Sequence, residues 1–244
     1  RRERAGVQAY VGESRQEVPH RAAMRYIMFL IVLPGISRTM APVSATPAAP
    51  KVRAIVTEDS LSVAPTVLGL HTTSARVRLV DKIPPRSTAT LEIDWNHKLP
   101  GGPGAGHRMT QRWADTLYQP TQWYPRVAAY DDLRGWDTEL YLGPAEFYNN
   151  FGRFDVRIDV PAGWIVSGTG VLQNPEQVLT PAARDRLGRV LATDGETVIE
   201  GAGEVGPGRA TAPAQRLVWH FVADSVNDFA WATAKKFVWT ATRA

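Results

Sequence analysis

Apolar and polar side chains alternate strictly in one stretch near the middle of the chain. Val156, Ile158 and Val160 are apolar, whereas Arg153, Asp155, Arg157 and Asp159 are polar. A period of two predicts a strand with one buried face and one wet face. On the wet face we expect Arg153, Arg157 and Asp159 to form charge pairs with a neighbouring strand.

Several other short runs have the length and pattern of strands. They lie at residues 52–57, 62–70, 75–80, 89–95, 197–200 and 216–222, with turn-forming residues between most of them. The run at 89–95 is the clearest, because Leu91, Ile93 and Trp95 alternate with polar residues. Short strands at this spacing predict a mainly β fold, an antiparallel β-sandwich.

One accessory helix is predicted near residues 180–193. Thr180 is suited to the N-cap and Pro181 to the first helical position, and the helix is expected to end near residues 194–195. The stretch 201–213, rich in glycine and alanine, is expected to be a flexible excursion. The glycine-rich stretch 99–107 is interpreted as a loop and not a phosphate-binding site, because no strand leads into it and no helix opens from it.

Charge is divided unevenly along the chain. The 244 residues have a formal net charge of +4, but residues 1–53 hold nine Lys or Arg against three Asp or Glu, which leaves −2 for the remainder. All eight Trp lie at or beyond Trp95. We therefore expect a basic tail or signal-like lead with a linker over residues 1–50 and one folded domain over 51–240. The slightly acidic folded part argues against nucleic acid as a partner.

The longest apolar run, residues 26–33, is too short to cross a bilayer as a helix, so no transmembrane span is predicted. Small residues follow it near 45–49. Residues 21–49 either act as a signal peptide, which would place the protein in the periplasm or outside the cell, or belong to the lead of a cytoplasmic protein. The sequence has no cysteine, which excludes disulfides and thiolate metal sites.

Four segments carry a resemblance to a known family. They are LEIDWNHKLP (residues 91–100), QWYPRVAAYDDLRGW (122–136), YLGPAEFYNNFGRFDVRIDVPAGWIVSGTG (141–170) and NDFAWATAKKFVW (227–239). In order and spacing they resemble the amino-terminal domain of the gluzincin zinc aminopeptidases, the family of membrane alanyl aminopeptidase and leukotriene hydrolase, in its bacterial branch. The resemblance implies a saddle-like β-sandwich that leans on a separate thermolysin-like catalytic domain and helps to roof its active site.

By the same resemblance, the parent enzyme would use zinc to cleave amino-terminal residues from peptide substrates. Such a site needs two His one helical turn apart with a Glu beside the first, and a further Glu as the third ligand. None of the five His of this chain is followed by Glu or by a second His four residues on. We expect this chain to bind no catalytic zinc, to be inactive alone, and to depend on the missing catalytic domain as its partner.

Three polar residues are candidates for the edge of the substrate pocket in the complete enzyme: Gln111, Gln122 and Glu146. Two other features have a plainer interpretation. Asp131 and Asp132 are interpreted as a solvated turn, and His220 as a packed or edge histidine between Trp219 and Phe221.

The aromatic residues leave two functions open. Trp123, Tyr124, Tyr130, Trp136 and Tyr141 would either fill a core and an interdomain contact or line the surface of a stand-alone carbohydrate- or protein-binding sandwich. The peptidase hypothesis predicts that the aromatics of residues 122–141 and 227–239 gather on one uncovered interdomain face. The binding-module hypothesis predicts two or three coplanar, exposed rings.

Overall fold

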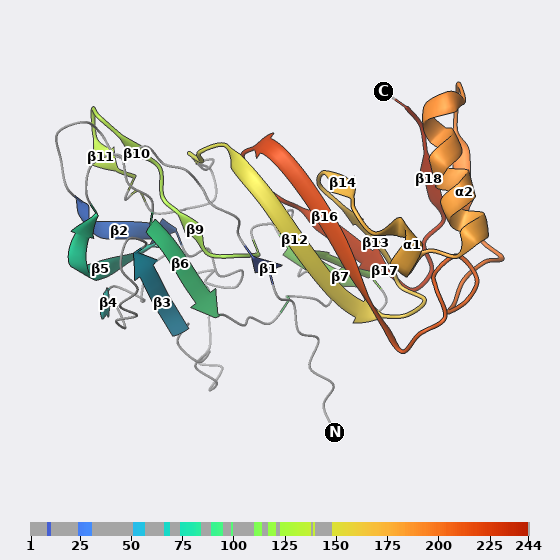
Figure 1. Ribbon diagram of the computed structural model, residues 1–244, viewed down its shortest axis with the longest axis horizontal. Helices are drawn as coiled ribbons and strands as arrows, with labels where there is room; N and C mark the ends of the chain where they lie inside the picture. The colour runs from blue at the N-terminus through green and yellow to red at the C-terminus, as the bar shows by residue number, and fades with distance from the viewer. Residues whose placement is uncertain are drawn as a thin grey trace. The chain divides into compact units, whose positions relative to one another are not determined.

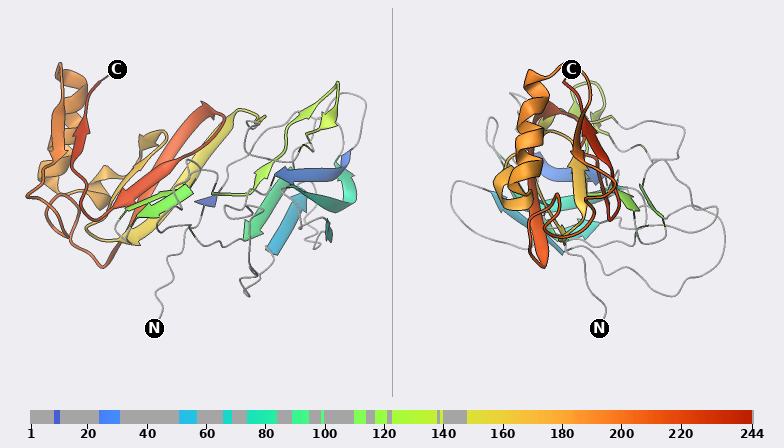
Figure 2. Two further views of the ribbon diagram at one scale, coloured as in Figure 1. Left: turned by 180° about the vertical axis from the view of Figure 1, so that it is seen from behind. Right: turned by 90° about the vertical axis from the view of Figure 1, so that its right-hand side faces the viewer.

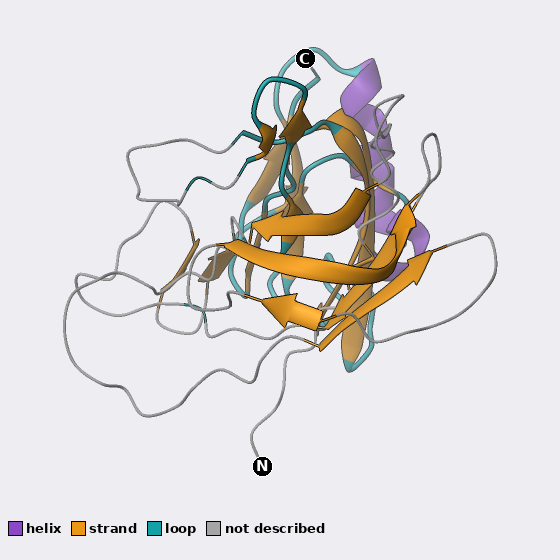
Figure 3. Ribbon diagram, turned by 90° about the vertical axis from the view of Figure 1, so that its left-hand side faces the viewer, coloured by secondary structure: helices purple, strands orange, loops and turns teal. Residues whose placement is uncertain are grey.

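The computed structural model describes residues 9–10, 24–30, 51–56, 66–68, 74–83, 89–94, 99, 110–113, 117–120, 123–137, 139 and 148–243. Most of its regular structure consists of strands in antiparallel sheets, and helices are few. Figure 3 shows this predominance of strands. The predicted mainly β, antiparallel fold with a helical accessory is confirmed.

The chain divides into two compact units. Unit 1 consists of Arg1–Gly12, Gly101–Thr121 and Arg153–Ala244, and unit 2 of Glu13–Pro100 and Gln122–Gly152. Each unit therefore combines segments that are distant in sequence. The division into a tail over residues 1–50 and a domain over 51–240 stays a prediction.

Unit 2 contains one four-stranded sheet in the order β4-β5-β2-β9, the pair β3-β6 and the hairpin β10-β11. The strands are Met24–Leu30 (β2), Lys51–Val56 (β3), Thr66–Leu68 (β4), Ser74–Ile83 (β5), Ala89–Asp94 (β6), Arg126–Val127 (β9), Tyr130–Asp131 (β10) and Gly135–Trp136 (β11). β2 pairs with β5 on one side and with β9 on the other. A strand of this sheet is thus drawn from the segment for which the sequence predicted a tail or lead.

Unit 1 contains two four-stranded sheets, in the orders β1-β12-β16-β14 and β13-β17-β8-β7, and the pair β15-β18. In Figure 1 the long strands β12 and β16 run side by side. The strands are Ala9–Tyr10 (β1), Thr110–Trp113 (β7), Leu117–Pro120 (β8), Gly152–Pro161 (β12), Ile165–Gly168 (β13), Val171–Leu172 (β14), Thr197–Glu200 (β15), Arg216–Val226 (β16), Trp231–Ala234 (β17) and Trp239–Ala241 (β18).

The two four-stranded sheets of unit 1 enclose an apolar core. On β12 and β16 the buried side chains alternate with more exposed ones, as expected for a strand with one buried face: Phe154, Val156, Ile158, Val160, Leu217, Trp219, Phe221 and Ala223 are buried. Gly168 of β13 approaches this layer, since a Cβ there would lie 3.2 Å from the ring of Phe229 and 3.5 Å from that of Phe221. The opposed sheets therefore form the predicted sandwich.

Helices lie at one end of unit 1. They are α1 (Pro175–Val178) and α2 (Pro181–Arg189), followed by a 3-10 turn over Val190–Ala192. Thr180 caps α2, because its hydroxyl accepts a hydrogen bond from the backbone N–H of Ala183, and Pro181 opens the helix. The predicted helix near 180–193 is present, and Figure 2 shows it beside β18.

The stretch 201–213 is attached to the rest of unit 1 and is not the free excursion that its composition suggested. Thr180 N–H donates to the carbonyl of Ala210 at 2.8 Å, and Ala212 N–H donates to that of Val178 at 2.9 Å. Ala210 and Thr211 are buried. Backbone pairing to the α1–α2 region fixes this glycine-rich segment.

Candidate functional site

The outer surface of β12 and β16 carries a row of charged and polar side chains, which we call the polar face. Its residues are Arg153, Asp155, Arg157, Asp159, Arg216, His220 and Asp224. Cross-strand ion pairs join Arg153 to Asp224 at 2.9 Å and Asp159 to Arg216 at 3.0 Å. The predicted charge pairing is therefore present for Arg153 and Asp159, whereas Arg157 bonds to Asp155 on its own strand.

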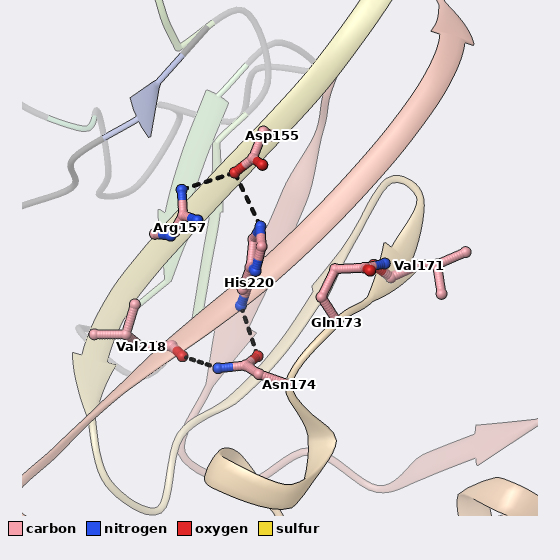
Figure 4. Close-up of polar contacts among 7 residues, drawn as sticks. All are labelled: Asp155, Arg157, Val171, Gln173, Asn174, Val218 and His220. Carbon is pink, nitrogen blue, oxygen red and sulfur yellow. Dashed lines mark hydrogen bonds and ion pairs between the residues drawn. The ribbon is translucent and has the colours of Figure 1, made fainter. Parts of the chain in front are cut away.

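His220 lies at the centre of the polar face (Figure 4). Its Nε2 is 2.9 Å from Oδ1 of Asp155, and Nη1 of Arg157 is 2.8 Å from the same oxygen. The side chains of Asp155 and His220 are partly buried. One carboxylate oxygen thus fixes both an imidazole and a guanidinium on the same surface.

Asn174, the residue before α1, holds the backbone of β16 from the other side (Figure 4). Its Oδ1 accepts a hydrogen bond from His220 N–H at 3.0 Å, and its Nδ2 donates to the carbonyl of Val218 at 2.9 Å. Nδ2 also donates to Oε1 of Gln177 at 3.0 Å. These bonds account for a buried amide side chain and tie α1 to the strand that carries His220.

The reactions that the polar face could support depend on which side chains contact the imidazole of His220. An Asp–His pair serves in nucleophilic catalysis when the histidine also contacts a hydroxyl or thiol nucleophile. Among the residues that the structure describes, the hydrogen bonds of the His220 ring reach Asp155 and no serine or threonine hydroxyl. The geometry therefore agrees with the interpretation of His220 as a packed edge histidine.

A second polar cluster lies where β15 ends, and we call it the Glu200 cluster: Glu200, Glu204 and Arg186. Glu200 is 2% exposed. Burial, and secondly the carboxylate of Glu204, raise the pKa of Glu200 to about 7, although Arg186 acts in the opposite direction. Glu204 shows the reverse behaviour, since the hydrogen bond from Gly201 N–H and then that from Arg186 lower its pKa. Two neighbouring carboxyls thus differ in their affinity for a proton.

Sequence analysis did not identify the Glu200 cluster. A strict period of two along β15 would place Glu200 on the same face as Val198, which is exposed. The pairing with β18 shifts register between Val198 and Glu200, and both Ile199 and Glu200 are buried. A bulge of this kind places consecutive residues on the same side, and alternation alone does not reveal it.

The three residues predicted at a substrate-pocket edge have different positions. The backbone of Gln111 lies in β7, paired with Gln119 of β8. Gln122 and Glu146 fall outside the described residues. Their role at a pocket edge stays a prediction.

The Asp131–Asp132 pair forms the predicted turn of the β10–β11 hairpin. Oδ1 of Asp131 accepts hydrogen bonds from the N–H groups of Leu133 and Arg134, at 2.9 and 2.6 Å. Asp132 is exposed. The first carboxylate is thus used by its own turn, as an aspartate in a turn commonly is.

Several aromatic side chains of these segments are buried in the described part of the chain. Trp123 and Tyr124 are buried with their rings edge to face, 5.2 Å apart, and the guanidinium of Arg126 lies 5.0 Å above the Tyr124 ring. In unit 1, Phe229 and Trp231 are buried as well, so the prediction that residues 227–239 present their aromatics on an uncovered face is wrong for these two. Tyr141 lies outside the described residues.

Comparison of the chain with protein-family models, with curated proteins and with solved structures gives no match in any of the three. Within the described part of the chain, no group of three or more His, Asp or Glu side chains is placed to hold a metal ion. None of the described helices is long and apolar enough to span a membrane.

Proposed function

We propose that this chain is the amino-terminal domain of a zinc aminopeptidase of the gluzincin type, which supports and partly roofs the active site of a thermolysin-like catalytic domain. The zinc and its ligands are assigned to that other domain, because none of the five His of this chain has the required spacing. The substrate of the complete enzyme is the amino-terminal end of a peptide.

The observation that carries the proposal is the way in which two of the four family-like segments assemble. Residues 141–170 supply β12 and β13, and residues 227–239 supply β17. β13 and β17 pair over four residues, from Ile165↔Ala234 to Gly168↔Trp231. Thr169 N–H then donates to the carbonyl of Ala230 at 3.0 Å.

This assembly explains why the family-like segments are rich in aromatic residues. Phe229 of the last segment lies in the core beside Phe154 and Phe221, with ring centroids 6.1 and 6.4 Å away. These aromatics thus pack one sandwich from segments that are far apart in the sequence. A carbohydrate-binding module would instead need exposed, coplanar rings, and Trp123 and Tyr124 are buried.

The first test is the genomic DNA that follows the codon for Ala244, read in all three forward frames. The proposal predicts a His-Glu-x-x-His segment downstream, in the same frame or in a shifted one. Unrelated sequence there would overturn the proposal and would favour the alternative function, a stand-alone binding module.

The biochemical test uses the purified chain with and without the protein encoded downstream. The chain alone should release no amino acid from an alanyl anilide in the presence of zinc, whereas the catalytic protein should do so and should bind the chain. Zinc-dependent release by the chain alone would contradict the proposal, as would failure of the two to associate. A glycan-binding assay on the purified chain tests the alternative function. Binding of a glycan would support the stand-alone carbohydrate-binding module.

A further inference from the structure

The carboxyl group of Glu200 is buried without a complete set of hydrogen bonds. Its Oε2 accepts no hydrogen bond, although the residue is 2% exposed. A buried carboxylate without partners is strongly disfavoured, so the group is expected to hold a proton in this arrangement.

Arg186 of α2 is the cation next to this carboxyl, and part of its hydrogen-bonding capacity is unused. Its Nη2 donates to Oε1 of Glu204 at 2.8 Å, but its buried Nε has no acceptor. The pair Arg186–Glu204 is partly exposed on both sides. Arg186 therefore bonds to the more accessible of two carboxyls, while Oε2 of the buried one has no donor.

Glu204 in turn closes a short turn at the end of β15. Its Oε2 accepts a hydrogen bond from Gly201 N–H at 2.9 Å, and its own N–H donates to the carbonyl of Gly201 at 3.0 Å. The side chain of Glu204 thus joins this turn to α2 through Arg186. Loss of the hydrogen bond between Arg186 and Glu204 would therefore weaken the attachment of the 201–204 turn to α2.

The charged groups that act on Glu200 come from α2 and from the 201–204 turn. α2 contributes Arg186, and its other charged residues, Arg184, Asp185 and Arg189, are exposed. The turn contributes Glu204. β18, which pairs with Glu200 through Trp239, has no charged residue. The balance of charge at Glu200 is therefore set by one arginine and one competing carboxylate.

We propose that Arg186 exchanges carboxylate partners when Glu200 loses its proton: it bonds to Glu204 while Glu200 is neutral, and to Glu200 once that carboxyl is ionised, which releases the 201–204 turn from α2. The exchange moves only a proton, which passes from the Glu200 carboxyl to water. It has a low cost on the Glu204 side, since a partly exposed carboxylate can return to water. On the Glu200 side the gain is large, because the buried negative charge acquires a charge-assisted hydrogen bond.

The exchange is testable on the full chain by NMR across the pKa of Glu200, about 7. The carboxyl carbon of Glu200 and the Nε–H of Arg186 should titrate together. Release of Glu204 from Arg186 removes one hydrogen bond to a charged group that holds the 201–204 turn to α2, so the turn should open more often. Protection of the Gly201 amide against hydrogen exchange, corrected for the intrinsic effect of pH, should therefore fall, by up to about tenfold, as Glu200 ionises. If Arg186 Nε–H and Gly201 do not respond while the Glu200 carbon titrates, the proposal is wrong.

Two variants make the assignment specific. Glu200→Gln cannot ionise and should keep Gly201 protected at every pH, whereas Glu196→Gln, which removes an exposed carboxyl just before β15, should titrate as the unaltered chain does. A pH response that persists in Glu200→Gln would overturn the proposal. If Glu200→Gln does not fold, the joint titration of Glu200 and Arg186 in the unaltered chain decides the question alone.

Discussion

Asn174 fixes the backbone of His220: its side-chain oxygen accepts the His220 N–H at 3.0 Å, while its amide nitrogen donates to the carbonyl of Val218 on the same strand. Together with the N–H of Gln173, which donates to the His220 carbonyl at 2.8 Å, this buried side chain continues the hydrogen bonding of β16 beyond the point where β14 ends. The polar face depends on this bond, because the strand backbone that Asn174 holds carries the imidazole beside Asp155.

Replacement of Asn174 by Ala should lower the free energy of unfolding by about 2 kcal/mol, because it leaves the partly buried N–H of His220 and carbonyl of Val218 without these partners. Urea denaturation at neutral pH measures the change. Gln173→Ala is the matched control. The Gln173 side chain is exposed and bonds only to the carbonyl of Val171 two residues away, so a loss of less than about 0.5 kcal/mol is expected. Equal losses in the two variants would show that Asn174 has no special role.

Gly170 should not tolerate a side chain. Its φ is +89°, and a Cβ there would lie 2.7 Å from Cβ of Ala223 and closer still to the carbonyl oxygen of Val222. Gly170→Ala is therefore expected to cost about 2 kcal/mol or more through backbone strain and displacement of β16. Thermal unfolding followed by circular dichroism would detect this loss.

Gly188 provides the opposite case within the same unit. It lies in α2, is exposed, and a Cβ there would meet no atom within 4 Å. Gly188→Ala should stabilise the protein by about 0.5–1 kcal/mol, because alanine loses less conformational entropy in a helix. Destabilisation by Gly188→Ala would mean that α2 does not extend over this residue.

Phe229 tests the core that joins two of the family-like segments. It is fully buried against Phe154 and Phe221, so Phe229→Ala should cost about 3–5 kcal/mol. Phe151 is 71% exposed, and Phe151→Ala should change the stability by less than about 0.5 kcal/mol. Chemical denaturation followed by tryptophan fluorescence compares the two. A small effect at Phe229 would restore the hypothesis that these aromatics face an absent partner.

The elements that could be predicted from the sequence are those specified by local pattern. The alternation of polar and apolar residues from Arg153 to Val160 was sufficient to predict β12, because one face of this strand is buried and the other is more exposed to solvent. Thr180 and Pro181 were sufficient for the start of α2, because capping depends on residues within one turn. Cross-strand charge pairing followed from the same alternation, although the partners Asp224 and Arg216 could not be named.

The features that could not be predicted depend on contacts between distant residues. The bonds from Asn174 to Val218 and His220 join residues 44 and 46 positions apart. Phe229 and Trp231 are buried in unit 1, where β17 pairs with the distant strand β13, whereas the peptidase hypothesis placed them on an open face. The burial of Glu200 follows from a register shift against β18, and neither composition nor periodicity indicates such a shift.

Stability should fall as the pH rises from about 4.5 to about 7, through Glu200. The folded-state pKa of this carboxyl is raised from 4.5 to about 7, so between these values the folded state keeps a proton that the unfolded chain has lost. The stabilisation is complete below pH 4.5 and is lost by the time the pH passes 7. At 1.36 kcal/mol per pKa unit the loss is about 3 kcal/mol. The lowered pKa of Glu204 acts in the opposite direction and at lower pH, where its stabilisation is lost as the pH falls.

Urea denaturation at a series of pH values measures how the free energy of unfolding changes with pH, and the difference between the unaltered chain and Glu200→Gln isolates the contribution of Glu200. A difference that stays constant from pH 4.5 to 7 would show that Glu200 is ionised throughout, and the buried carboxyl would then have to be paired in solution.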